Sequence, residues 1–374
     1  MNIPVAKPYF GIEEETAAVE AIRSGWVSQG PKVREFEEKF AEYVGAKYAV
    51  ATTSCTTALH AALVVSGIRP GDEVIVPSLS FIATANAVVY AGAQPVFADI
   101  DPGTCNVTAE TIRKALTPKT KAVMPVHQMG LPVDLDPITN LCKERGLILI
   151  EDAACAIGSE YKGKRIGGHG NTACFSFHPR KIITTGEGGM ITTDSRDLAE
   201  RLRRIRHHGM SVSDIERHVS SKVILEEYPE IGYNYRMTDV QAAIGIEQLK
   251  KLPSIIDRRR QIADYYKKEL SKIPFIRVPD APDYAFHNYQ SYWIEILGSS
   301  PVSRDALMQR LLDRGIATRR GIMAIHNEMC YATHLVFLPA TERITRNTVL
   351  LPVYPSMIEE EVQFVIEGIA AILC

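Results

Sequence analysis

The sequence predicts an α/β protein built on a mostly parallel β-sheet that helices cover on both faces. Short apolar runs alternate with stretches of helical spacing along the first two thirds of the 374 residues. Strands that alternate with helices form βαβ units, because parallel neighbours need a long crossover connection. The composition agrees with a large globular protein, since 46% of the residues are hydrophobic and 23% are charged.

The expected elements of the sheet follow in chain order. Apolar residues recur at helical spacing from Val33 to Val44, and Gly45 follows as a stop. A later helix ends before Gly67 for the same reason. The expected strands are the apolar runs 48–52, 73–76, 95–98, 121–126 and 147–151, and the helices expected between them are 56–65, 81–90 and 135–145.

The last third predicts a smaller α+β domain. We expect residues 1–250 to form the large domain and residues 251–374 the small one. A helix that begins near Val240 is expected to stop at Pro253, because proline lacks a backbone N–H and clashes with the preceding turn. The other elements expected here are helices at 255–273, 303–314 and 356–373 and a strand at 292–297.

Charge and cysteine content exclude several classes of protein. The chain carries 42 Lys and Arg against 44 Asp and Glu, so it lacks the basic balance of a general nucleic-acid or anionic-membrane binder. The seven cysteines form no C-x-x-C pair, which argues against a zinc finger and a disulfide framework. His207 and His208 have no carboxylate partner in the sequence, so no metal site is expected.

No targeting or membrane segment is expected either. The first residues lack the apolar core of a signal peptide. The uncharged stretch 74–98 contains two prolines and several polar residues, so we interpret it as buried strands and a helix. The sequence therefore predicts a cytoplasmic enzyme.

An acid and a lysine mark the candidate catalytic site. Asp152 follows the run 147–151, at the carboxyl end of a strand, where open parallel sheets bind their ligands. Lys181 lies in a turn before the Gly-rich segment 184–189, and Ser176 precedes it in a run that can face the same cleft. A pyridoxal phosphate (PLP) site needs an amine that forms a Schiff base and a carboxylate that keeps the pyridine nitrogen protonated.

A segment upstream offers a site for the phosphate of such a cofactor. Residues 51–59 lead from an expected strand into a helix and are rich in hydroxyl groups. The first N–H groups of a helix have no acceptor within it, and its N-terminus attracts negative charge.

Together these segments resemble the DegT/DnrJ/EryC1/StrS family of sugar aminotransferases, PLP enzymes of the aspartate aminotransferase fold (fold type I). Each motif is weak alone, but they occur in the family's order and cover nearly the whole chain. The resemblance implies a large PLP-binding domain and a smaller C-terminal α+β domain. The matching segments are 24–31, 53–59, 77–86, 99–101, 125–127, 151–158, 175–189 and 232–239.

The resemblance implies a role for each matching cofactor residue. Lys181 matches the Schiff-base lysine, which also moves the proton during amino transfer, and Asp152 matches the partner of the pyridine nitrogen. Phe81 matches the aromatic residue that stacks on the cofactor ring. The residues that match the phosphate cradle are Ser54, Cys55 and Ser176.

Further positions concern the second subunit and the substrate. Asn234 matches a residue that reaches the phosphate of the neighbouring subunit, which implies a homodimer with shared active sites. His326 resembles a histidine near the sugar pocket, and Arg319 with Arg320 can hold a diphosphate or a donor carboxylate. Cys155 departs from the family, in which Gln or His is commoner and bonds to the cofactor's phenolic oxygen, so its cofactor contact is open.

Each candidate also has a structural interpretation. Lysines are usually solvated, acids after a strand often cap a helix and aromatic residues usually belong to the core. Lys181, Asp152 and Phe81 would therefore be weak candidates singly. The residues at 54 and 55 can simply begin a helix, Asn234 can serve a turn, and His178 suits a structural role as well as a substrate contact.

The sequence favours transfer of an amino group, by resemblance from L-glutamate, to a nucleotide-linked keto sugar. Segments 26–31 and 233–239 look more like relatives that act at sugar C4 than at C3, which favours a 4-keto-6-deoxy sugar. The alternatives are a keto-cyclitol (inosose) aminotransferase, a sugar dehydratase that uses pyridoxamine phosphate (PMP), and a regulatory protein that kept the fold. Lys181 argues against the dehydratases, which replace it with His, and Lys181 with Asp152 argues against the regulator.

Overall fold

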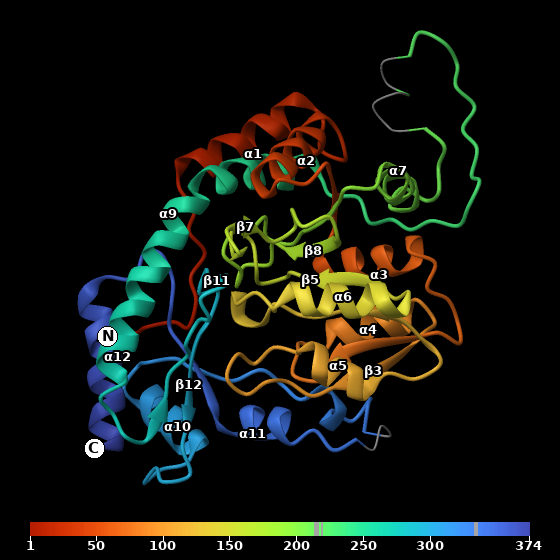
Figure 1. Cartoon of the computed structure of the whole chain (residues 1–374). Coiled ribbons are helices and arrows are strands. Elements are labelled where there is room, and N and C mark those ends of the chain that lie inside the picture. Colours follow the sequence, from red (N-terminus) through yellow and green to blue (C-terminus); the bar gives the residue numbers. More distant parts are fainter. Residues whose placement is uncertain (213–216, 218–219, 333–335) are drawn as a thin grey trace.

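A seven-stranded sheet forms the centre of the computed structural model, which describes residues 1–212, 217, 220–332 and 336–374 (Figure 1). Strand β9 is antiparallel to both of its neighbours, and the other six strands are parallel to one another. The predicted α/β fold with a mostly parallel sheet is confirmed. The strand order is β1 (Tyr48–Thr52), β9 (Gly189–Thr193), β8 (Thr172–Ser176), β5 (Ile148–Asp152), β4 (Thr120–Val123), β2 (Glu73–Pro77) and β3 (Gln94–Ala98).

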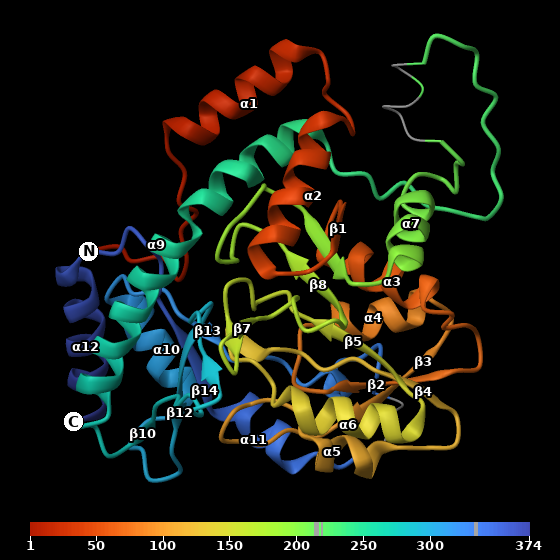
Figure 2. The same cartoon turned by 45° about the horizontal axis from the view of Figure 1, so that its top comes forward.

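Helices cover both faces of this sheet (Figure 2). Successive strand residues point to opposite faces, so Val50 packs in one cluster while Ala49 and Ala51 pack in the other. Both faces are therefore buried, which is why the strands are continuously apolar. The first cluster includes α3 (Cys55–Val65), α4 (Ala83–Tyr90) and α7 (Arg196–Ile205), and the second includes α2 (Pro31–Val44), α5 (Ala109–Ala115) and α6 (Leu135–Arg145).

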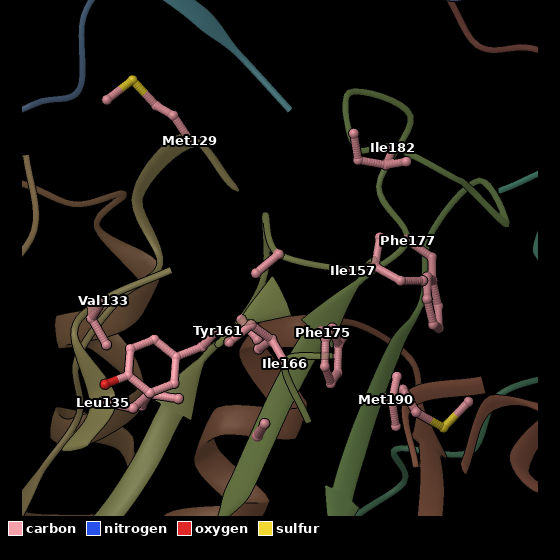
Figure 3. Packing of buried hydrophobic residues seen from close by; sticks show 14 of the residues in the cluster. Met129, Val133, Leu135, Ile157, Tyr161, Ile166, Phe175, Phe177, Ile182 and Met190 are labelled. Carbon is pink, nitrogen blue, oxygen red and sulfur yellow. The ribbon is translucent and has the colours of Figure 1, made fainter. Parts of the chain in front are cut away.

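Aromatic packing fixes the strands that lead to the site. Phe175 of β8 lies beside Met190 of β9 in the cluster of Figure 3. The ring centroid of Phe40 on α2 is 5.1 Å from that of Phe175 and 5.7 Å from that of Phe177. Such edge-to-face pairs stabilise by about 0.5–1.5 kcal/mol beyond their buried area. The end of β8 and the turn after it are thus held on a rigid base.

The last third of the chain contains a four-stranded antiparallel sheet with its own group of helices and its own hydrophobic core. Its core also takes in Ile3, which forms a bridge with Ile316 near the end of α10. The strand order is β10 (Ile276–Arg277), β12 (Tyr292–Ile296), β14 (Thr348–Leu351) and β13 (Arg319–Arg320), with helices α10 (Arg304–Asp313), α11 (Pro339–Asn347) and α12 (Glu359–Leu373). A small three-stranded sheet consists of β11 (Ala285–Phe286), β6 (Glu160–Tyr161) and β7 (Lys164–Arg165), and two 3₁₀ turns are η1 (Gln128–Gly130) and η2 (Ile325–Asn327).

The predicted helix end at Pro253 is wrong, because one long helix runs through this residue. Helix α9 (Asp239–Leu270) is continuous through this proline. The proline removes one helical hydrogen bond, but Leu249, Leu252 and Ile256 around it are buried in the large core. Tertiary packing outweighs the local preference, as it does for most helices. The N-terminal part of α9 packs against α1 (Ile12–Ser24) and α2, and its C-terminal part joins the second core. The division at residue 250 falls inside this helix and stays a prediction.

The uncharged stretch 74–98 is folded as the sequence analysis proposed. It contains most of β2, all of α4 and all of β3. Among the described residues, no helix is both long enough and apolar enough to span a membrane.

Candidate active site

A cavity of about 760 Å³ lies at the carboxyl ends of the parallel strands. Such an edge is where open α/β sheets bind their ligands. The cavity brings together nine of the eleven predicted site residues from five separate segments. They are Ser54, Cys55, Phe81, Asp152, Cys155, Ser176, Lys181, Arg319 and Arg320.

Asp152 forms the acidic end of this cavity. The side chain is 4% exposed, and it accepts hydrogen bonds from Thr84 Oγ1 at 2.8 Å and from the Ala154 N–H at 3.1 Å. Burial raises the pKa of this carboxyl group above its ordinary value, although these two donors and the charge of Lys181 act in the opposite direction. A buried carboxylate of this kind calls for a cationic partner, such as a protonated pyridine nitrogen.

A second buried network fixes the strand that carries Asp152. His127 Nδ1 accepts from the Val133 N–H at 3.1 Å, so its Nε2 is the nitrogen that donates to Glu151 at 2.9 Å. Asn171 donates to the other carboxylate oxygen of Glu151 at 2.8 Å. The backbone N–H of His127 also donates to the carbonyl oxygen of Asp152 at 3.1 Å. These contacts hold the end of β5 without using the carboxylate of Asp152.

Lys181 reaches the cavity from the turn that follows β8. Its backbone N–H donates to the carbonyl oxygen of His178 at 2.8 Å, and its Nζ donates to Cys155 Sγ at 3.1 Å. Burial by itself lowers the pKa of the lysine, but Cys155, Cys55 and Asp152 outweigh burial and raise that pKa. The amine therefore lies in one cavity with the carboxylate of Asp152, in direct contact with a thiol.

The N-terminus of α3 supplies a cradle for an anion. Ser54 caps the helix by accepting from the Thr57 N–H at 3.2 Å, and its Oγ also lies 3.2 Å from Thr57 Oγ1. Cys55 and Thr56 are the first helical residues, so their N–H groups have no acceptor within the helix. The thiol of Cys55 points instead to the carbonyl oxygen of Cys174, with Sγ and O 3.6 Å apart. Cys55 therefore offers its backbone N–H to the cavity.

Gly189 allows this cradle to approach the sheet. A Cβ at this position would lie 2.4 Å from the carbonyl oxygen of Ser54 and 2.7 Å from the backbone nitrogen of Cys55. Those backbone atoms cannot swing aside as a flexible side chain could. We expect Gly189→Ala to weaken PLP affinity at least about tenfold and to lower the free energy of unfolding by about 1–3 kcal/mol.

Equilibrium titration with PLP and chemical denaturation measure the two effects of this change. The matched control is Gly298→Ala, because Gly298 has open space around its Cβ position. Full PLP affinity in the Gly189 variant would contradict the assignment of the α3 N-terminus as the phosphate cradle.

The remaining predicted residues fall at different distances from the cavity. Phe81 lines it and is 59% exposed, as a stacking surface requires. Asn234 is exposed and lies outside the cavity lining, beside His207 in an isolated bridge. His326 is buried outside the lining, with its Nδ1 2.6 Å from Ser78 Oγ. The structure therefore does not bring Asn234 or His326 into the site of their own chain.

Sequence reasoning missed several residues of the cavity. Thr84 bonds to Asp152, Gln128 and Gln290 line the wall, and Arg180 joins Arg319 at the opening. Burial and the charge of Arg319, which lines the same cavity, lower the pKa of Arg180. Arg180 was detectable as the neighbour of Lys181. Thr84 lies in the matching segment 77–86 but was given no role there, and Gln128 and Gln290 carried no local signal.

The residues present fit PLP. The cavity holds an amine, a carboxylate, an exposed aromatic ring and a helix N-terminus with free N–H donors. These are the groups that a pyridine ring with an aldehyde and a phosphate needs.

Comparison with known proteins agrees with this geometry. The model of the DegT/DnrJ/EryC1/StrS aminotransferase family matches residues 9–370. The spore coat polysaccharide biosynthesis protein SpsC of Bacillus subtilis is 40% identical over 99% of this chain and 97% of its own length.

Solved structures are also similar over nearly the whole chain. The putative sugar aminotransferase Spr1654 of Streptococcus pneumoniae in its PLP form is 28% identical, with a TM-score of 0.92 over 100% of this chain and 98% of that chain. DesI, solved in the presence of its TDP-sugar product, is 32% identical with a TM-score of 0.90, over 99% and 92% of the two chains. The chain therefore belongs to the DegT/DnrJ/EryC1/StrS family, and it is a sugar aminotransferase that uses PLP.

Proposed function

We propose that this enzyme transfers the amino group of L-glutamate to a nucleotide-linked 4-keto-6-deoxy sugar. The observation that carries the proposal is the group of exposed arginines at the cavity opening, Arg180, Arg319 and Arg320. Guanidinium groups bind phosphates and carboxylates through paired hydrogen bonds. A diphosphate at this opening would direct the attached sugar inward, toward Lys181.

Each of these cavity residues has a separate proposed role in amino transfer. PLP, when bound, supplies the aldehyde that takes up the donor's amine and a ring that accepts electrons. The Nζ of Lys181 would remove the proton from the donor's Cα and return it to the carbon on the other side of the transferred nitrogen. Asp152 holds a proton on the ring nitrogen, Phe81 stacks on the ring, and the start of α3 binds the phosphate.

Two relatives support the choice of substrate class. The printed name of SpsC links it to polysaccharide biosynthesis, and DesI was solved with its TDP-sugar product. An amino sugar attached to a nucleotide is the form in which a glycosyltransferase would use it. We propose that the product enters polysaccharide assembly in the cytoplasm, which suits a chain whose seven cysteines are all free.

Product mass tests the proposed substrate directly. The purified enzyme is incubated with PLP, L-glutamate and a TDP-linked 4-keto-6-deoxyhexose, and the product is analysed by mass spectrometry. We expect replacement of the keto oxygen by an amine, with formation of 2-oxoglutarate. Amination of an inosose in place of the nucleotide sugar, or loss of water from the sugar, would overturn the proposal in favour of the cyclitol or dehydratase alternative.

We also propose that the enzyme is a homodimer in which Asn234 completes the phosphate site of the partner. The support is that Asn234 is exposed and outside the cavity of its own chain. A Lys181→Ala subunit and an Asn234→Ala subunit should then complement each other. Each mixed dimer has one site with both residues intact, so random mixing should restore about a quarter of the wild-type activity.

Subunit exchange followed by an activity assay measures this complementation. Each variant alone is the baseline, and a mixture of Lys181→Ala with Lys181→Ala/Asn234→Ala is the control that offers no intact site. Activity no higher than the sum of the two baselines would contradict a shared site.

A further inference from the structure

The contact between Lys181 and Cys155 has a consequence outside the amino-transfer reaction. We infer that Cys155 and Lys181 form a peroxide-sensitive pair, in which oxidation of the thiol leads to a covalent sulfur–nitrogen bond that blocks the lysine. The inference rests on two observations. Lys181 Nζ and Cys155 Sγ are 3.1 Å apart, and both residues line the same cavity.

The environment of Cys155 differs from that of the other cysteines. Four of them, Cys55, Cys105, Cys142 and Cys174, are buried, and burial raises the pKa of each thiol, which keeps it protonated and unreactive. Cys330 and Cys374 are exposed at the surface. Cys155 is half-buried in the wall of a large cavity, where a small oxidant can reach it, and a lysine donates to its sulfur. Thiols beside a cation are those that peroxides oxidise selectively.

One short segment holds both partners in place. Asn288 Nδ2 donates to the carbonyl oxygens of Cys155 and Ile157, each at 2.9 Å. Gln290 Nε2 donates to the carbonyl oxygen of Arg180, the residue before the lysine, at 2.8 Å. The Gln290 N–H donates to Asn288 Oδ1 at 2.8 Å. The loops of the thiol and of the amine are therefore tied to the same anchor, which keeps the two reactive atoms within reach.

The reaction balances with hydrogen peroxide as the oxidant. Peroxide oxidises the Cys155 thiol to a sulfenic acid as its O–O bond breaks, and one water leaves. The neutral amine of Lys181 then attacks the sulfur, an S–N bond forms, and the S–O bond breaks to release a second water. The sum is one thiol, one amine and one peroxide giving one S–N bond and two waters. A dithiol reverses it by reducing the S–N bond to the thiol and the amine.

Oxidation of the thiol also prepares the amine for attack. In the reduced protein, Cys155 is the largest contributor that raises the pKa of Lys181, and burial lowers it. A neutral sulfenic acid favours the ammonium form less than the reduced sulfur does, although Cys55 and Asp152 still favour it. Oxidation therefore increases the share of neutral, nucleophilic amine while it makes the sulfur an electrophile.

The cofactor state sets when the pair can react. PMP carries no aldehyde and leaves the lysine amine free, whereas PLP engages that amine. The cross-link should therefore form in the PMP-loaded enzyme and be suppressed at least about tenfold in the PLP-loaded enzyme. This expectation depends on the cofactor and not on the identity of the sugar or of the donor, so it can fail or succeed independently of the proposed substrate.

Peptide mapping tests the inference without an activity assay. Enzyme loaded with PMP or with PLP is treated with hydrogen peroxide, digested with trypsin without reduction, and analysed by mass spectrometry. Residues 146–162 contain Cys155 as their single cysteine, and cleavage after Arg180 produces a peptide that starts at Lys181. The expected species is peptide 146–162 joined to peptide 181–196, with two hydrogens fewer than their sum and no cleavage after Lys181. Dithiothreitol should remove it.

Two variants make the result decisive. Cys155→Ser should abolish the cross-linked species, whereas Cys330→Ser, which removes an exposed thiol, should leave it unchanged. A sulfinic acid at Cys155, or a disulfide between Cys55 and Cys155, with unmodified Lys181 in the PMP-loaded enzyme would overturn the inference. Equal yields from the PMP and PLP forms would overturn it as well.

Discussion

Replacing Lys181 by alanine is expected to lower kcat for amino transfer by at least about 10⁴-fold, because the same amine acts as covalent partner and as proton carrier. The fold should persist, since the side chain lines a cavity and packs in no core cluster. Removal of Nζ also leaves the Cys155 thiol without its donor. The measurement is a single-turnover assay together with borohydride reduction of the PLP-loaded protein and mapping of the labelled peptide.

The matched control is Lys164→Ala, which removes an exposed lysine from β7 and should leave both readouts unchanged. In the wild-type protein the label should fall on the peptide that contains Lys181. A label on another lysine, or amino transfer within tenfold of wild type in the Lys181 variant, would refute its assignment as the catalytic amine.

The part of the site that could be predicted from the sequence is the part that local rules determine. Asp152 ends a strongly apolar strand, and Ser54 and Cys55 follow another at the start of a helix, so the sheet alone brings them to one edge. Lys181 was marked by the turn and the glycines around it. The resemblance added Phe81, which has no distinctive local pattern.

The part that could not be predicted depends on distant segments. Thr84 bonds to Asp152 across 68 positions of the chain, and Gln290 reaches Arg180 across 110. Thr84 and Asp152 both lie in matching segments, but no local pattern shows that their side chains meet, and Gln290 lies outside those segments. For His326, the resemblance predicted a position near the sugar pocket. In the structure its side chain is buried against Ser78, outside the cavity lining. Pro253 shows the same limit for the fold, since core packing on both sides carries α9 through it.

Replacing Asp152 by asparagine should affect catalysis and stability in opposite directions. Loss of the charge that holds a proton on the ring nitrogen should lower kcat on the order of 10²–10³-fold, as loss of one preorganised electrostatic group does elsewhere. The variant can keep the local hydrogen bonds. The Ala154 N–H still has an oxygen to donate to, and Thr84 can accept from the new amide while it donates to Ser80, whose Oγ is 2.8 Å away.

The effect on stability follows from the pKa of Asp152. Burial raises this pKa in the cofactor-free protein, so ionisation of Asp152 disfavours folding as the pH rises through its folded-state value. Asparagine has no charge to bury. The cofactor-free Asp152→Asn protein should therefore melt at a temperature equal to or above that of the cofactor-free wild type at neutral pH. The difference in melting temperature between the two cofactor-free proteins should narrow as the pH falls toward about 3.9, the ordinary pKa of aspartate.

With PLP bound, the wild type should melt at a higher temperature than the Asp152→Asn variant. The wild-type carboxylate gains a cationic partner on the ring nitrogen, and a ligand that binds only the folded state raises the melting temperature by its affinity. The variant has no carboxylate to pair with the ring nitrogen, so PLP should raise its melting temperature less than it raises that of the wild type. Differential scanning fluorimetry of both proteins, with and without PLP at two pH values, separates the charge effect from a simple loss of packing. A variant that is less stable than wild type by the same amount with and without PLP would mean that Asp152 serves the fold and not the cofactor.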